Sequence, residues 1–463
     1  MLQPVVAHQS GVGSETRTER DSLGVYEVPE GALYGVHTAR ARDNFRISGL
    51  SLHQFPEMVQ ALAMVKKASA RANRMLGVLS LEKAAVIEAV CDELLAGKHH
   101  DHFIVDMIQG GAGTSTNMNA NEVIANLGLL ELGFSKGECQ HLHPNDDVNK
   151  SQSTNDVYPT ALRLAILLNM QAFTQEHQRL CDAFEANALE FDGIAKLGRT
   201  QLQDAVPMTL GQEFRSFSNT IEEDIERLRD TSRLLWEVNL GGTAIGTGVN
   251  TPANYAEVAV GELRRISGFP LRSARNLVEA SSDLGAFVAF SGILKRVAVK
   301  LSKICNDLRL LSSGPRSGFG EIRLPPVQAG SSIMPGKVNP VIPEVVNQIA
   351  FQVIGNDLTV TMAAEAGQLQ LNAMKPVAIL NILQSLRILK SGMACLTDRC
   401  VLGIEADEAR CHFLLNNSLA YATSLVPEIG YERAAQAAKY ALAKNLSISE
   451  ALIELGIEAT VSN

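Results

Sequence analysis

In one stretch of this sequence the apolar residues recur with a period that is compatible with few folds. Between residues 290 and 311 the apolar positions follow one another at alternating intervals of four and three: Phe290, Leu294, Val297, Leu301, Ile304, Leu308 and Leu311. A mean interval of about 3.5 residues keeps an apolar stripe aligned along a partner helix over many turns. The stripe therefore predicts a long helix that packs lengthwise against other helices.

Two further stripes of the same kind indicate that several such helices lie side by side. Their members are Phe214, Phe217, Ile221, Leu228, Leu235 and Val238 in one stripe, and Ile342, Val345, Ile349 and Val353 in the other. Aromatic residues make up only 5% of the chain, so the core is built mostly from small and aliphatic side chains, which suit closely packed helices. The spacing also fits a buried helix of any all-α protein, and that alternative stays open.

The pattern changes along the chain and suggests a division into domains. We predict a mainly α-helical chain with a long central helix bundle. Residues 1–16 are polar and aperiodic and are predicted to be a mobile extension. They precede an N-terminal domain (17–150), a central helix-bundle domain (151–405) and a small C-terminal helical domain (406–463), in which the predicted helices are shorter.

Composition and charge exclude several classes of protein. The net charge is −9, from 41 basic and 50 acidic residues, which disfavours a nucleic-acid backbone as partner. No run of 18 apolar residues predicts a membrane span, and the first 20 residues lack the pattern of a secretory signal. The seven cysteines are widely spaced without a Cys-x-x-Cys pair, as expected of free thiols in the cytoplasm.

Four segments rich in glycine, hydroxyl and amide residues interrupt the helical patterns and could carry chemistry. Hydroxyl groups, amide N–H groups and lysine hold a carboxylate well. Each segment alone is more often a polar loop or a helix cap, but four of one style favour a composite site for an anion. The segments are residues 110–117, 149–156, 198–204 and 330–340.

The sequence does not support three other kinds of site. A phosphate-binding P-loop would require glycine where Ser331 stands, and Val338 follows the lysine. The glycine-rich segment 241–248 follows a helical pattern rather than a strand, so a dinucleotide fold is not supported. The histidines at positions 99, 100 and 102 lack a matching carboxylate or cysteine cluster, and no metal site is predicted.

The segment Gly330-Ser331-Ser332-Ile333-Met334-Pro335-Gly336-Lys337-Val338-Asn339-Pro340 resembles the signature of the aspartase/fumarase superfamily. The other three loops are similar to the remaining active-site regions of that superfamily, in the same chain order. The resemblance covers the chain from about Arg17 onward and is strongest with members that release ammonia from L-aspartate. It implies a three-domain, mostly helical subunit of the aspartase/fumarase type. It also implies a homotetramer whose central helices form a common bundle, with each active site shared between three subunits. No cofactor is implied; activation by a divalent cation is compatible with it, at a site that the sequence does not identify.

The resemblance implies a reversible anti elimination that converts L-aspartate into fumarate and ammonia, through an enediolate intermediate. The position that matches the general base is Ser331, and Lys337 would supply positive charge beside it. Matching positions around the β-carboxylate are Thr114, Ser153, Thr154 and Ser332. Matching positions around the α-carboxylate and the leaving amine are Thr200, Lys337, Asn339, Asn155 and Gln201. A supporting carboxylate is matched by Glu344, and Arg40 is either a substrate contact or half of a structural ion pair.

One position separates the candidate reactions. The fumarases carry histidine where this chain has Gln201, because adding water calls for a group that moves a proton near neutral pH. A glutamine amide oxygen can instead accept a hydrogen bond from an ammonium group. Gln201 therefore favours an ammonia-lyase over a class II fumarase, although no proton donor for the leaving amine is visible. A non-catalytic structural descendant is a third alternative, and the intact set of site residues weighs against it.

Overall fold

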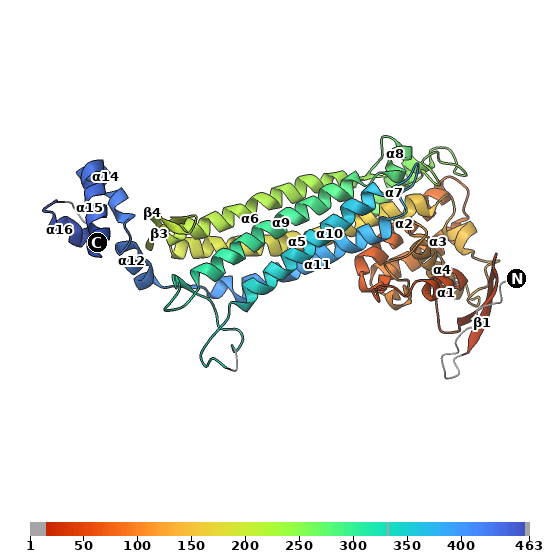
Figure 1. Ribbon diagram of the computed structural model, residues 1–463. Helices are drawn as coiled ribbons and strands as arrows, with labels where there is room; N and C mark the ends of the chain where they lie inside the picture. The colour runs from red at the N-terminus through yellow and green to blue at the C-terminus, as the bar shows by residue number, and fades with distance from the viewer. Residues whose placement is uncertain (1–14, 331–332, 459–463) are drawn as a thin grey trace. The chain divides into compact units, whose positions relative to one another are not determined.

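The computed structural model describes residues 15–330 and 333–458, and nearly all of its regular structure is helical (Figure 1). This confirms the predicted mainly α-helical fold class. The predicted extension 1–16 lies outside the described residues except for its last two, of which Thr16 begins the first strand. The longest helices are α5 (Thr154–Glu190), α6 (Leu210–Ser232), α9 (Gly285–Leu311), α10 (Val341–Glu365) and α11 (Lys375–Arg399).

Shorter helices occupy the two ends of the sequence and the segments between the long helices. The N-terminal part contains α1 (Val36–Asn44), α2 (Pro56–Met75), α3 (Leu81–Leu95) and α4 (Thr114–Glu131). Between α6 and α9 lie α7 (Tyr255–Ser267) and α8 (Leu277–Ser282). The C-terminal part contains α12 (Glu408–Asn416), α13 (Tyr421–Ser424), α14 (Val426–Ile429), α15 (Tyr431–Lys444) and α16 (Ile448–Glu454).

The described strands pair only two at a time. Antiparallel pairs are formed by β1 (Thr16–Asp21) with β2 (Gly24–Pro29), by β3 (Ala195–Thr200) with β4 (Gln203–Thr209), and by β7 (Ile322–Arg323) with β8 (Glu405–Ala406). One short parallel pair joins β5 (Glu237–Val238) to β6 (Arg272–Ser273). A two-stranded sheet is marginally stable alone, so each pair depends on the helices around it.

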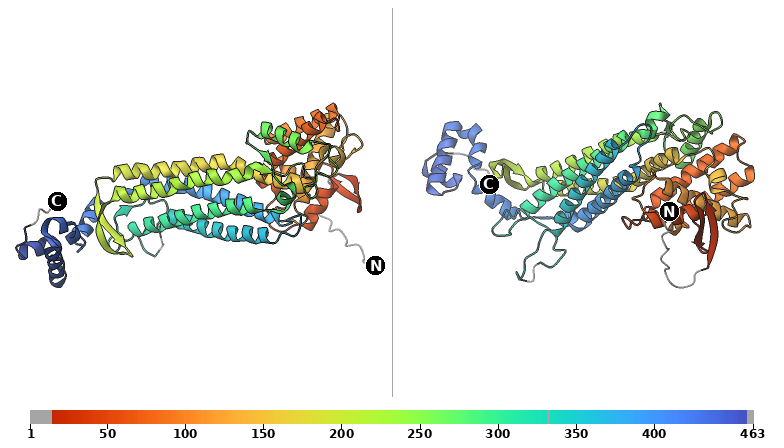
Figure 2. Two further views of the ribbon diagram at one scale, coloured as in Figure 1. Left: turned by 90° about the horizontal axis from the view of Figure 1, so that it is seen from above. Right: turned by 45° about the vertical axis from the view of Figure 1, so that its right-hand side comes forward.

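The chain divides into two compact units that are not continuous in sequence. Unit 1 contains the described residues up to Met170 with Asp230–Ser291 and Asn356–Gln384, and unit 2 contains Gln171–Arg229, Gly292–Gly355 and the described residues from Ser385 on. Each of the five long helices contributes a segment to both units. Figure 2 shows these segments side by side within unit 2. The domains predicted from the sequence are continuous ranges of the chain, whereas these units are not. The predicted domain boundaries therefore stay a prediction.

The apolar stripe between residues 290 and 311 lies in α9 and is buried along its whole length, with each of its seven side chains at most 4% exposed. The second stripe is also buried, but α6 ends at Ser232, so Leu235 and Val238 belong to a 3-10 turn and to β5. The third stripe differs from the prediction, because Val345 is 39% exposed and Val346 and Ala350 are buried instead. Only part of the predicted apolar stripe of α10 is therefore buried in this chain's own core.

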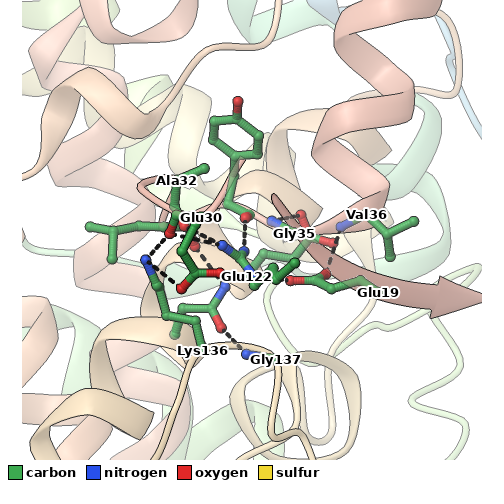
Figure 3. A network of polar contacts seen from close by, with 12 residues as sticks. Glu19, Glu30, Ala32, Gly35, Val36, Glu122, Lys136 and Gly137 are labelled. Atoms are coloured by element: carbon green, nitrogen blue, oxygen red, sulfur yellow. Dashed lines mark hydrogen bonds and ion pairs between the residues drawn. The ribbon is translucent and has the colours of Figure 1, made fainter. Parts of the chain in front are cut away.

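Helix α1 is attached to α4 by a buried carboxylate (Figure 3). Glu122 of α4 accepts backbone N–H bonds from Gly35 at 2.9 Å, from His37 at 2.8 Å and from Thr38 at 3.1 Å. Burial raises the pKa of the Glu122 carboxyl above its ordinary value. The first N–H groups of a helix have no partner inside the helix, so this carboxylate satisfies them at the start of α1. Glu19 of β1 adds a bond from the N–H of Val36 at 2.8 Å.

The C-terminal helices have a small core of their own. Its buried residues come from α13 to α16 and the turns between them: Ala422, Leu425, Ile429, Ala434, Ala437, Ala441, Ile448, Ala451 and Leu452. This agrees with the expectation of short helices at the end of the chain. Among the residues that the structure describes, no helix combines the length and the apolarity needed to cross a membrane.

Candidate active site

The first predicted loop leads into α4 through three residues with positive φ, Gly111, Ala112 and Gly113. A Cβ at position 113 would overlap the ring of Tyr158, so the close approach to α5 requires glycine there as well. Thr114 is the first residue of α4 and is exposed, and its hydroxyl donates to the carbonyl of Gly111 at 2.7 Å. The loop thus places a threonine hydroxyl at the positive end of an 18-residue helix.

The second predicted loop ends in a helix cap at the start of α5. The hydroxyl of Ser153 accepts a bond from the N–H of Asn155 at 3.2 Å, and Asp156 in turn accepts from the N–H of Ser153 at 2.9 Å. Ser153 thus caps the helix through the second residue of its first turn, and Asp156 supplies the reciprocal half of a capping box. Thr154 and Asn155, both half-buried, form the first turn of the helix.

The N-termini of α4 and α5 lie next to each other within unit 1. The side chain of Asn117, one turn into α4, donates to Asn149 in the second loop at 3.1 Å, and Gly113 lies against Tyr158. The positive ends of two helices therefore meet in the same region. The structure thus brings together the predicted site residues Thr114, Ser153, Thr154 and Asn155.

A buried lysine that the sequence analysis did not single out supports the second loop. Lys66 of α2 is fully buried and donates to the side chains of Asn149 at 2.8 Å and Gln152 at 2.9 Å. Burial lowers the pKa of this ammonium group to about 7, although the negative charge of Asp156 opposes the shift. Lys66 lies on the same face of α2 as Leu62, Ala63 and Ala70, and the residue that follows it in sequence, Lys67, is also a lysine. Nothing in the local sequence identifies it as a buried lysine.

The third predicted loop is a β-hairpin rather than an irregular segment. Strands β3 and β4 pair from Ala195 with Thr209 to Thr200 with Gln203, which leaves a two-residue turn. The turn residues Gln201 and Leu202 have φ values of 53° and 62°. Two-residue hairpins favour such left-handed turns, usually with Asn and Gly, so this pair carries backbone strain. Thr200 and Gln201 are exposed at the tip of the hairpin.

A fully buried carboxylate holds this hairpin in unit 2. Glu321 forms ion pairs with two residues of β3, Lys196 and Arg199, each at 2.8 Å. The Arg199 guanidinium also lies over the ring of Phe319, 4.1 Å from its centroid. Arg199 directly precedes Thr200, so Glu321 fixes the strand end that carries the tip. The ion pair joins residues 122 positions apart, and no local pattern could have revealed it.

The fourth predicted loop precedes α10. Ser331 and Ser332 lie outside the described residues. A Cβ at Gly330 would overlap the carbonyl of Lys337, so the neck of the loop requires glycine. Lys337 is exposed and Asn339 is half-buried. Glu344 lies in the first turn of α10, 4.0 Å from Arg309.

Arg40 is engaged in the N-terminal hairpin of unit 1. Its guanidinium forms two bonds to the carboxylate of Asp21, at 2.8 and 3.1 Å, and lies 5.0 Å from the ring centroid of Tyr26. The pKa of the Asp21 carboxyl is lowered, because hydrogen bonds from Arg40 and Leu23 outweigh the effect of burial. Of the two roles expected for Arg40, the structure therefore supports the structural ion pair, with Asp21 as the partner.

The predicted site residues fall into both units. Unit 1 holds Arg40, Thr114, Ser153, Thr154 and Asn155. Unit 2 holds Thr200, Gln201, Lys337, Asn339 and Glu344. Among the described residues, no group of three or more histidine, cysteine, aspartate or glutamate side chains is arranged to hold a metal ion. The donors that remain are hydroxyls, amides, one lysine and helix N-termini, a set suited to carboxylates.

A helical fold with donors suited to carboxylates is compatible with an enzyme that acts on a small acid. Comparison with known families identifies the family. A family described as "Lyase" matches residues 24–355, and one described as "Fumarase C C-terminus" matches residues 422–461. The chain belongs to this lyase family, the aspartase/fumarase superfamily.

Within that family, the similarity extends over nearly the whole chain. An aspartate ammonia-lyase of Pseudomonas fluorescens is 59% identical over 442 residues, which cover 95% of this chain and 92% of that protein. A crystal structure described as fumarate lyase:delta crystallin from Brucella melitensis bound to cobalt superimposes with a TM-score of 0.94 at 59% identity, covering 96% of this chain and 97% of that one. The class II fumarase of Schistosoma mansoni gives a TM-score of 0.91 at 33% identity, with 96% of each chain covered.

The Glu321 ion pairs lead to a prediction about stability. Replacing Glu321 by Gln leaves Lys196 and Arg199 without their shared counter-charge, and removing one partner of a buried ion pair costs about 3–5 kcal/mol. We expect Glu321→Gln to lower the urea concentration at the midpoint of unfolding by a corresponding amount. Unfolding is monitored by circular dichroism at one protein concentration. The control is Glu213→Gln, because Glu213 also pairs with Lys196 but its side chain is 22% exposed. The free energy of unfolding should fall by about 1 kcal/mol or less in Glu213→Gln. Equal losses in both variants would contradict the role of Glu321 in holding the hairpin.

Proposed function

We propose that this protein is a carbon–nitrogen lyase that eliminates ammonia from L-aspartate to give fumarate, reversibly and with anti geometry. The observation that carries the proposal is the 59% identity to an aspartate ammonia-lyase over 95% of the chain. The residues at the predicted site are compatible with this chemistry, because they offer many donors for a substrate with two carboxylates.

In the proposed reaction, a base removes a proton from Cβ, the electrons of that bond form an enediolate with the β-carboxylate, and the Cα–N bond then breaks to release ammonia. The Cβ proton is weakly acidic, so the main task of the site is to stabilise the dianionic enediolate. Ser331 acts as the base in this proposal. A serine hydroxyl is a weak base unless it is deprotonated, and Lys337 would supply the positive charge that favours deprotonation.

Three of the four residues assigned to the β-carboxylate belong to unit 1. Thr114 and Thr154 begin α4 and α5, and Ser153 caps α5. The two helix N-termini supply fixed positive potential that needs no rearrangement when charge develops on the substrate. We assign Thr114, Ser153, Thr154 and Ser332 to the β-carboxylate and its enediolate.

The remaining assignments concern the α-carboxylate and the amine. Thr200, Lys337 and Asn339 are assigned to the α-carboxylate, and Asn155 and Gln201 to the leaving amine. The strained turn at Gln201 supports a functional role, because such conformations are retained where the surroundings impose them. Glu344 is assigned as an auxiliary carboxylate on the resemblance alone. Arg40 is assigned to the ion pair with Asp21 rather than to the substrate.

A class II fumarase is the second candidate, favoured by the TM-score of 0.91 to the enzyme of Schistosoma mansoni. The two reactions share the enediolate and differ in the leaving group. Hydration requires proton transfer to or from water, which histidine performs near neutral pH and glutamine does not. Gln201 therefore favours ammonia as the leaving group.

We also propose a homotetramer in which different subunits complete each active site. Helix α10 supports this through an exposed apolar stripe, spaced three, four and four residues apart: Phe351, Ile354, Leu358 and Met362. Three of these side chains are more than 60% exposed, and a continuous apolar stripe of this kind is typical of an interface between subunits.

No cofactor is needed for the proposed chemistry. A response to divalent cations would be an activation rather than a step of the reaction, and its site is not assigned. We propose the cytoplasm as the location, supported by seven cysteines that are all free thiols.

The first experiment compares substrates. Purified protein is mixed with L-aspartate or, separately, with L-malate, and fumarate is followed by ultraviolet absorbance. We expect fumarate from aspartate alone. Fumarate from malate but not from aspartate would identify a hydratase, and none from either would point to a structural protein of the same fold.

The second experiment concerns the proposed base. Ser331→Ala removes the only group assigned to take the Cβ proton, so turnover of aspartate should fall by at least about a thousandfold. Its sedimentation should match that of the unmodified protein, because no packing role is assigned to this hydroxyl. Turnover close to the unmodified rate would remove Ser331 from the role of base.

The third experiment concerns the assembly. Leu358→Glu places a charge on the exposed stripe of α10 and should shift the sedimentation coefficient toward smaller species. Leu442→Glu is the matched control, because Leu442 is 71% exposed on α15, away from the stripe. A tetramer that withstands the change at Leu358 as well as the change at Leu442 would show that the interface lies elsewhere.

A further inference from the structure

The glycine-rich segment 241–248 fits no nucleotide motif, and the proposed reaction does not use it directly. In the structure it forms a tight turn of unit 1 whose backbone binds a carboxylate. The N–H groups of Gly241 and Thr243 both donate to Oδ2 of Asp156, each at 2.9 Å. The turn therefore contacts the residue that follows Asn155 in the second predicted loop.

Asp156 joins this turn to the cap of α5. Its other oxygen, Oδ1, accepts the N–H of Ser153 at 2.9 Å. The Asp156 side chain is completely buried, and each of its oxygens binds a different segment of the chain. One carboxylate thus fixes the distance between the Ser153 cap and the glycine-rich turn.

The turn itself has little freedom to move. Gly241 has a φ of 91°, and a Cβ there would overlap Ala256 of α7. Gly246 has a φ of 94°, and a Cβ there would overlap the backbone of α8 at Leu277. Both positions require glycine on account of backbone conformation and close packing. The turn is therefore a fixed base to which the second loop is attached.

Two further bonds orient Asn155. Its side-chain Nδ2 donates to the carbonyl of Ala244 at 2.8 Å, and its own carbonyl accepts from the side chain of Asn239 at 3.0 Å. With Nδ2 committed to the turn, Oδ1 is the end of the Asn155 amide that can accept a bond from an ammonium group. This is the orientation that a contact with the leaving amine requires.

We propose that Asp156 is a positioning residue that holds Ser153 and Asn155 against the 241–246 turn in the geometry that binds the substrate. This inference rests on the proposed function and deepens it. Asp156 touches no substrate in this scheme. It acts through the hydroxyl of Ser153 and the amide of Asn155, and a displacement of about 1 Å in such groups can cost about a hundredfold in rate.

The charge of Asp156 supports a readout that a purely structural role would not give. Burial raises the pKa of its carboxyl to about 6, although the N–H bonds from Ser153, Thr243 and Gly241 and the charge of Lys66 act in the opposite direction. Lys66 faces it from α2 and Tyr255 from α7. The carboxylate form, which accepts all three bonds, is present above about pH 6 and is lost as the pH falls through that value.

The test compares Asp156→Asn with the unmodified protein on L-aspartate across pH. The amide keeps the shape but turns an NH2 group toward backbone N–H donors on one side. We expect kcat/KM to fall about 10- to 100-fold at pH 8, with KM raised, and the decline near pH 6 to disappear from the profile. Unchanged kcat/KM, within twofold, together with an unchanged profile would overturn the proposal.

A matched control is Asp106→Asn. Asp106 also accepts backbone N–H bonds, from residues 47, 48, 49 and 108, and the pKa of its carboxyl is lowered because these bonds and the Ser48 hydroxyl outweigh burial. We expect Asp106→Asn to reduce thermal stability and leave the decline near pH 6 in place. A profile altered in the same way by both variants would show a general effect of lost stability, against the proposal.

Two additions keep the test decisive. If Asp156→Asn does not fold, Asn239→Ala removes the donor to the Asn155 carbonyl without changing any charge, and a loss of kcat/KM below twofold would then overturn the proposal.

Stabilisation by fumarate against heat gives a readout independent of turnover. Unmodified protein that is inactive on aspartate refutes the proposed function, whereas an equal fumarate-induced shift in the Asp156→Asn variant refutes the positioning role.

Discussion

Buried carboxylates that bind backbone N–H groups or paired cations hold the non-helical segments of this structure. Glu122 satisfies the start of α1, Asp156 joins the cap of α5 to the glycine-rich turn, and Glu321 fixes the hairpin through Lys196 and Arg199. A charge removed from water is costly unless it is paired or hydrogen-bonded. Each of these carboxylates therefore favours the arrangement that keeps its partners in place.

The long helices provide the frame on which these loops lie. Several predicted site residues occur at helix starts: Thr114 in α4, Thr154 and Asn155 in α5, and Glu344 in α10. Thr200 and Gln201 lie instead at the tip of the β3–β4 hairpin that leads into α6. Because a rigid helix fixes its own first turn, donors placed at helix starts need little rearrangement to meet a charged substrate.

The acidic net charge of −9 is compatible with a dianionic substrate because the donors are local. Two helix N-termini meet in unit 1, with Thr114 and Thr154 as their first residues. Short-range potential at such a site is set by the nearest dipoles and charges, whereas the distant acidic surface is screened by salt.

The sequence by itself determined the helical class, the buried stripe of α9 and the four loops that hold the predicted site, because periodicity and glycine placement express local geometry. It also carried the family resemblance. Only the tertiary structure decided that Thr200 and Gln201 lie at a hairpin tip, that the stripe of α10 is partly exposed, and that Lys66, Asp156 and Glu321 support the loops. The Ser153-x-x-Asp156 spacing could have suggested the cap. The bonds from Asp156 to the turn span 85 and 87 residues, and that from Glu321 to Arg199 spans 122, so they arise only when the folded chain brings these segments together.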